Sequence, residues 1–152
     1  MRHPLHPVLV HFPVACWSLA TAADLASMYW GEPAWRFAGG LLIVGTLAAV
    51  PAMLAGFYEL TALPDDDAAI ADVYRHMGAM LGALTLYTLS LLLRLDHTTL
   101  LAPGTLAMAC SASGFICLSV GGWLGGRLVY GHRLGGEAPP SRPSAMEKSP
   151  RD

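Results

Sequence analysis

The sequence predicts an all-α protein, an integral membrane four-helix up-down bundle with a disordered C-terminal tail. Composition is the first observation: hydrophobic residues make up 54% of the 152 residues and charged residues only 13%. That balance leaves too little polar surface for a soluble domain of this size. The second observation is a set of four apolar stretches, each near the roughly 20 residues that a helix needs to cross a bilayer.

The expected helices cover about residues 8–30, 34–60, 73–95 and 99–130 of a transmembrane domain that comprises residues 1–134. Pro7 suits a first helical position, and Pro13 either lies in the first turn of a later-starting helix or kinks an earlier one by freeing the Leu9 carbonyl, so the entry is rigid in both cases. The connections are short, so neighbouring helices should run antiparallel. Residues 135–152 are rich in proline, serine and charge, which predicts a disordered tail.

Two other features of the helices bear on this organisation. Residues 20–22 resemble a signal-peptide cleavage site, but His11 and Pro13 interrupt the apolar core that a signal needs, so we expect the first helix to be retained. No helix pair is evident in the sequence as a repeat of the other. Glycines at a four-residue spacing predict close helix packing, and they are Gly78 and Gly82, Gly121 and Gly125, and Gly122 and Gly126.

Histidines gather at one end of the expected bundle. The starts of the first and third helices and the ends of the second and fourth share one membrane side. That side carries His3, His6, His11, Glu59, His76 and His132, whereas His97 lies at the other. An imidazole at membrane depth is costly unless it faces a partner or a cavity. We therefore expect His11 and His76 to face each other diagonally across the bundle, with His132 in reserve.

Two carboxylates in the apolar stretches also need partners. Asp24 lies deep in the first helix, where we expect a structural role and a partner such as a hydroxyl, an indole or Arg36. Glu59 ends the second helix on the histidine side. There it would accept a hydrogen bond from an imidazole N–H or bind a metal directly.

Several segments together resemble a known family. These are HPLHPVLVHFP at the start, AGFYEL at the end of the second expected helix, His76, and GGWLGGRLVYGHRLG near the end. In this order they resemble the bacterial four-helix membrane family catalogued as domain of unknown function 2231. The chain departs from the family pattern at Glu59, where an aspartate is usual, and at Met80, where an asparagine is usual. The resemblance implies a helical membrane bundle, and some relatives are joined to a Rieske-type iron–sulfur domain, which implies electron transfer.

Three functional hypotheses follow. In the first, imidazoles on different helices bind b-type haem for electron transfer, with His11, His76 and His132 as the cofactor-binding residues. In the second, nitrogen and oxygen ligands bind an ion of iron, copper or zinc, and these ligands are His6, His11, Glu59, His76 and His132. In the third, the protein is a structural or partner-binding membrane subunit without a cofactor.

The sequence also limits the partners. No basic cluster is dense enough for nucleic acid, and no nucleophile elbow, zinc-protease motif or phosphate loop indicates a hydrolase. The expected partners are the lipid bilayer and a redox partner such as a Rieske-type protein or a quinone, and a homo-oligomer stays open. We expect the bacterial inner membrane as the location. Both termini should be cytoplasmic, because basic residues favour that side: Arg2, Arg75, Arg127 and Arg133 against Arg36 and Arg94.

Overall fold

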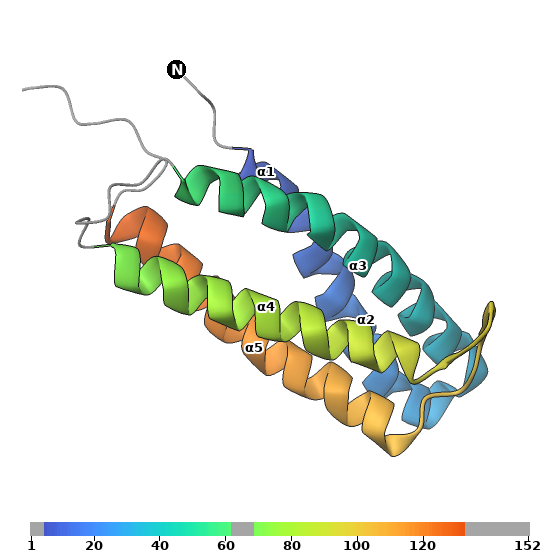
Figure 1. Ribbon diagram of the computed structural model, residues 1–152. Coiled ribbons are helices and arrows are strands. Elements are labelled where there is room, and N and C mark those ends of the chain that lie inside the picture. Colours follow the sequence, from blue (N-terminus) through green and yellow to red (C-terminus); the bar gives the residue numbers. More distant parts are fainter. Residues whose placement is uncertain (1–4, 62–68, 133–152) are drawn as a thin grey trace, which may run out of the picture.

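The computed structural model describes residues 5–61 and 69–132, which form a bundle of four long helices (Figure 1). The helices are α1 (His6–Leu9), α2 (His11–Trp30), α3 (Glu32–Leu60), α4 (Ile70–Leu92) and α5 (Thr105–Tyr130), and the strands are β1 (Leu95–Asp96) and β2 (Thr99–Leu100). The prediction of an all-α bundle is confirmed. The tail expected at residues 135–152 lies outside the described residues.

The helices are organised as two hairpins. The spans His6–Trp30, Glu32–Leu60 and Thr105–Tyr130 are each long and apolar enough to cross a membrane. The remaining long helix, α4, packs along α5, just as α2 packs along α3 (Figure 1). Contacts between the two hairpins are fewer than contacts within each hairpin. The bundle is therefore two tight hairpins that meet along a looser seam.

The first span lacks one helical hydrogen bond next to Val10, where the backbone itself stays helical, with φ -67° and ψ -23°. Pro13 has no N–H to donate to the Leu9 carbonyl, and α1 ends at Leu9. Val10 still donates to the His6 carbonyl at 3.0 Å and accepts from Val14 at 3.1 Å, so the chain continues across this position. The short α1 packs against α3, and this packing places His6 inside the bundle, near one of its two ends.

The connection between α2 and α3 is shorter than expected. It consists of Gly31 alone, which has a φ of 64° that glycine adopts without steric cost. The second helix therefore begins at Glu32 rather than at residue 34, with Pro33 in its first turn.

The connection between the third and fourth helices differs most from the expectation. The third helix ends at Leu92 rather than at residue 95, and the fourth begins at Thr105 rather than at residue 99. Between them Leu95 pairs with Leu100 in a small antiparallel hairpin, an arrangement that hydropathy alone does not reveal. The hairpin folds back on the bundle: a Cβ on Gly39 of α3 would lie 2.8 Å from Leu100 Cδ1.

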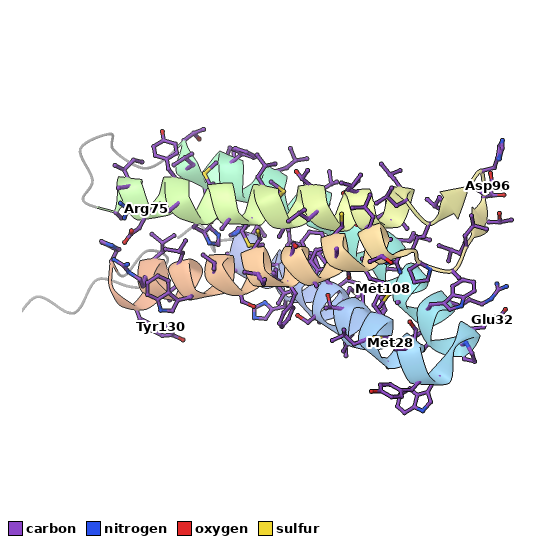
Figure 2. The ribbon with its side chains drawn as sticks, turned by 90° about the horizontal axis from the view of Figure 1, so that it is seen from below. Met28, Glu32, Arg75, Asp96, Met108 and Tyr130 are labelled. Atoms are coloured by element: carbon purple, nitrogen blue, oxygen red, sulfur yellow. The ribbon has the colours of Figure 1, made fainter. Side chains whose placement is uncertain are left out.

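The interior combines many small and polar side chains with a few large ones such as Trp17 and Tyr87, and many other large apolar side chains face outward. Alanines at positions 20, 38, 49, 52, 83 and 107 are buried. Met28 and Tyr130, at opposite ends of the structure, are 70% and 86% exposed (Figure 2). Small residues let helix backbones approach closely. In lipid this close packing drives helix association, because the hydrophobic effect does not act between the helices there.

A paired histidine site at one end of the bundle

His6 is held by two contacts with α3. Its backbone N–H donates to Glu59 Oε1 at 3.0 Å, and its ring Nδ1 lies 2.7 Å from the Ala52 carbonyl oxygen. The ring lies directly against Gly56, where a Cβ would be 3.0 Å from Nδ1. Glu59 thus contacts the histidine site, but through the backbone of His6 rather than through an imidazole N–H.

His76 is held in a similar way by α5. Its ring Nδ1 lies 2.8 Å from the Gly121 carbonyl oxygen. The ring lies against Gly125, where a Cβ would be 3.2 Å from His76 Cε1. Gly125 belongs to the predicted set of packing glycines, and the side chain that packs against it is that of His76, a candidate ligand.

The two imidazoles lie next to each other across the seam between the hairpins. Their ring centroids are 6.2 Å apart, and their planes are at 85°. A carbonyl oxygen can only accept a hydrogen bond, so each Nδ1 carries the proton when the ring is neutral. Each Nε2 then keeps a lone pair that is available to a ligand. The site therefore presents two oriented nitrogen donors from diagonally opposite helices.

The histidine pair is the first of three contacts that join the first long span to α4 and the residues directly after it, and all three contacts have the same spacing in the sequence. Trp17 stacks on Tyr87 with ring centroids 4.9 Å apart, and Asp24 binds Arg94. In all three pairs the partners are 70 residues apart in the sequence. The first and third long helices therefore lie in parallel register, and aromatic rings fill the centre between the histidines and the ion pair.

Glycines on α3 and α5 extend this correspondence to both hairpins. Gly45 meets Trp17 as Gly114 meets Tyr87, and Gly56 meets His6 as Gly125 meets His76. The expectation that no helix pair repeats the other is therefore wrong for these contacts. The repeat went undetected because it consists of a few contact positions embedded in dissimilar apolar residues. The two histidines occupy equivalent places in the two halves.

The structure does not bring His11 and His76 together. His11 is exposed on α2, and His6 takes the inward position that we expected for it. The two histidines are five residues apart, which is about 140° around a helix of 3.6 residues per turn, so only one of them can face the bundle interior. At the other end of the bundle, His97 is exposed and contacts Asp96 at 2.9 Å. His3 lies outside the described residues.

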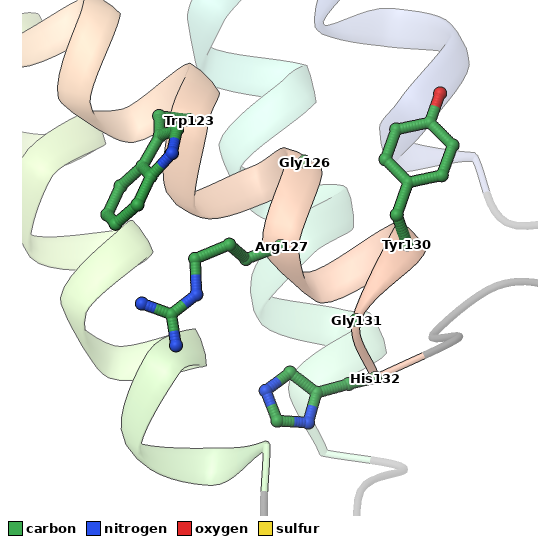
Figure 3. Close-up of a pocket in the computed structure, with 6 residues that line it drawn as sticks. All are labelled: Trp123, Gly126, Arg127, Tyr130, Gly131 and His132. Atoms are coloured by element: carbon green, nitrogen blue, oxygen red, sulfur yellow. The ribbon is translucent and has the colours of Figure 1, made fainter.

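His132 follows α5 (Figure 3). It contacts the Asp72 carboxylate instead of the histidine pair. Its Nε2 lies 3.2 Å from Asp72 Oδ2, while Arg75 and Arg127 bind the same carboxylate at 3.0 and 2.9 Å. Asp72 precedes the apolar stretch of residues 77–93. The hydrogen bond from His132, with the two guanidinium groups, holds the pKa of the Asp72 carboxyl below its ordinary value. His132 thus helps to close the end of the bundle.

A buried ion pair lies at the opposite end. Arg94 donates to Asp24 at 2.8 and 3.1 Å, and their side chains are 0% and 2% exposed. Arg94 also donates to the Ser90 carbonyl and hydroxyl at 3.1 and 2.8 Å. We expected a partner such as Arg36 for Asp24, but Arg36 binds Glu32 at 2.7 Å. A basic residue at the end of an apolar stretch predicts an interfacial position, so this burial of Arg94 was not expected.

The described residues set a limit on metal binding by side chains. In residues 5–61 and 69–132, no group of three or more histidine, cysteine, aspartate or glutamate side chains is placed to hold a metal ion. The five ligands of the metal hypothesis are accordingly divided. His6 and His76 meet, Glu59 binds a backbone N–H, His132 binds Asp72, and His11 faces outward.

The family comparison agrees with this architecture. Residues 2–138 match the family DUF2231, described as a predicted membrane protein. The chain belongs to this family. No curated protein and no solved structure matches the chain. As a DUF2231 membrane protein, the chain contacts the lipid bilayer through the large apolar side chains on its outer surface.

Proposed function

We propose that this DUF2231 protein is a membrane redox protein that binds b-type haem between His6 and His76 and transfers electrons. The observation that carries the proposal is the imidazole pair itself, with each Nδ1 on a backbone carbonyl and the centroids 6.2 Å apart. His6 replaces His11 in the haem hypothesis, and His76 keeps its place.

The spacing of the two rings would allow both imidazoles to hold one metal-centred group. An imidazole nitrogen binds a transition metal at ~2 Å and the ring centre lies ~1 Å further, so two rings that share one ion have centres no more than about 6 Å apart. The observed separation of 6.2 Å matches this value. Hydrogen bonds from the other ring nitrogen fix the orientation and tautomer of metal-binding histidines in general. Ala52 and Gly121 supply these acceptors.

The number of donors favours haem over a bare metal ion. A metal site made only from protein side chains usually needs three or four of them. Haem requires just one or two axial ligands from the protein, and two imidazoles converge here. Both histidines lie at the seam between the two hairpins, so a group held by both would lie on that seam. When bound, the haem would supply a one-electron redox centre.

The surrounding residues would position the ligands and limit access to them. Glu59 fixes the backbone at His6, while Gly56 and Gly125 let the two rings approach the helices. The stacked Trp17 and Tyr87 rings fill the centre of the bundle beyond the pair and exclude water from that direction. A quinone or a Rieske-type protein is the proposed redox partner.

An optical spectrum of the purified full-length protein, oxidised and reduced with dithionite, tests the proposal. The expected result is the sharp reduced spectrum of a six-coordinate b-type haem, which His6→Ala and His76→Ala abolish. His11→Ala and His97→Ala serve as matched controls and should keep it. A colourless protein that also lacks metal would instead support a structural subunit without a cofactor.

We propose the bacterial inner membrane as the location, with both termini in the cytoplasm. The burial of Arg94 supports this orientation, because it removes one basic residue from the far side and leaves Arg36 there. Arg75 and Arg127 are at the end that carries the histidine pair. Reporter fusions at the C-terminus should be active in the cytoplasm, and periplasmic activity would reverse the assignment.

A further inference from the structure

A surface pocket at the histidine end of the bundle combines positive charge with exposed aromatic rings (Figure 3). It lies at the end of α5, and it is open to the surroundings. Its lining residues are Trp123, Gly126, Arg127, Tyr130, Gly131 and His132. The haem proposal uses none of these residues.

The charges at this pocket are unbalanced. Arg127 Nη2 lies 2.9 Å from Asp72 Oδ2, and Arg75 Nη1 lies 3.0 Å from Asp72 Oδ1. Two guanidinium groups thus share one carboxylate, and their side chains remain 47% and 68% exposed. In the part of the chain that the structure describes, this cluster carries an excess of one positive charge, with His132 counted as neutral. The acidic residues 65–67 lie outside that part.

The aromatic rings place the pocket at the level of the lipid headgroups. Trp123 and Tyr130 are 63% and 86% exposed near the end of a membrane span. Indole and phenol rings at such positions prefer the boundary between acyl chains and water. The Arg127 guanidinium lies over the Trp123 ring, 5.2 Å from its centroid, so the charge is held beside this boundary.

We propose that this pocket binds the phosphate headgroup of an anionic phospholipid, with Arg127 and Arg75 as the charged contacts and Trp123 against the acyl boundary. Guanidinium groups bind phosphate through two parallel hydrogen bonds. Arg127 lines the pocket, and Arg75 reaches the same Asp72 carboxylate from α4, so the two guanidinium groups lie together beside the pocket. Basic residues at the end of a membrane span attract anionic headgroups. The exposed N–H groups that are not used by Asp72 provide donors for such a headgroup.

The opposite end of the bundle offers a matched control. The Arg36 guanidinium lies 5.1 Å from the centroid of the Trp35 ring, which closely matches the arrangement of Arg127 and Trp123. Arg36 binds Glu32 at 2.7 Å in a one-to-one pair, so it carries no excess charge there. The two ends therefore share the cation–aromatic contact and differ in charge balance.

The test is native mass spectrometry of the full-length protein in a neutral detergent, titrated with phosphatidylglycerol or phosphatidylcholine. We expect preferential retention of phosphatidylglycerol. Arg127→Gln should weaken it about fivefold, the effect of roughly one basic residue near an anionic headgroup. Arg36→Gln should leave it unchanged. Trp123→Ala, which leaves the ion cluster intact, should also weaken retention and covers the case in which Arg127→Gln fails to fold.

Three outcomes would overturn the proposal. Equal retention of the two lipids would show that charge does not select the headgroup. Equal losses in Arg127→Gln and Arg36→Gln would show a general surface effect. Full retention in both Arg127→Gln and Trp123→Ala would place the lipid elsewhere.

Discussion

The buried ion pair between Asp24 and Arg94 supports a quantitative prediction about stability. The guanidinium makes two bonds to the carboxylate, at 2.8 and 3.1 Å, and neither side chain is more than 2% exposed. Arg94→Met therefore leaves a carboxylate buried without its cation. An uncompensated charge of this kind lowers the free energy of unfolding by about 3–5 kcal/mol. Asp24→Leu leaves the guanidinium alone and should have a similar cost.

The double variant separates the pair from its environment. Asp24→Leu combined with Arg94→Met removes both charges, and replacing a whole buried pair by apolar residues is often neutral to within about 1 kcal/mol. The two single changes should therefore be far from additive, with a coupling energy of about 3 kcal/mol or more. The Ser90 carbonyl also accepts a hydrogen bond from Arg94, and the double variant removes this donor. Any stability that the double variant still loses is therefore due in part to this hydrogen bond.

The assay is reversible unfolding by dodecyl sulfate in mixed micelles, followed by far-ultraviolet circular dichroism. Glu32 and Arg36 serve as the control, because their side chains are 62% and 61% exposed. Disrupting this exposed pair should change stability by no more than about 0.5 kcal/mol. If Arg94→Met costs less than about 1 kcal/mol, or if the double variant is additive, the reasoning about the buried pair is refuted.

The remaining predictions concern the residues that hold the histidine pair and the Asp72 carboxylate at the same end of the bundle. Gly125→Ala and Gly56→Ala would each press a methyl group against a histidine ring and should lower the haem content of the protein. Gly122→Ala places its methyl group in open space and should leave the haem content unchanged. A pyridine haemochrome assay measures the haem content of all three variants. Glu59→Leu should weaken haem retention about tenfold. Glu59→Gln should weaken it less, because glutamine keeps an oxygen that can accept the hydrogen bond from the His6 N–H. The fraction of haem that stays bound through gel filtration measures both effects, and equal losses in the two variants would contradict the prediction. The stabilisation that the Asp72 carboxylate provides should be present above the ordinary carboxyl pKa of 3.8 and lost as pH falls through its lowered pKa. Melting midpoints of the wild type and Asp72→Asn should therefore converge on acidification, and a widening gap would contradict the sign.

Hydropathy and loop length were enough to predict the bundle and the end at which the histidines gather. Four apolar stretches with short connections permit few other arrangements. The same reasoning could not assign the inward histidine. His6 and His11 lie about 140° apart around a helix, and their depth depends on where the helix starts relative to Pro7 and Pro13, which hydropathy does not decide.

Arg94 and the internal correspondence were missed for a different reason. Arg94 follows the last apolar residues of its stretch, where a basic residue normally marks an interface. Its burial accompanies its bonds to Asp24 and Ser90, and the strands that follow it are too short to show periodicity in the sequence. The equal spacing of His6, Trp17 and Asp24 from their partners was present in the sequence. It becomes meaningful only when the contacts show which residues correspond.

Electron paramagnetic resonance of the oxidised, purified protein tests the central claim most directly, because it reports the ligands of the iron. Two imidazoles from His6 and His76 predict a low-spin, six-coordinate ferric signal. His6→Ala and His76→Ala should each convert it to high spin or remove it, and His11→Ala should leave it unchanged. A wild-type protein without a ferric haem signal, or a low-spin signal that survives in either of the first two variants, would contradict the assignment.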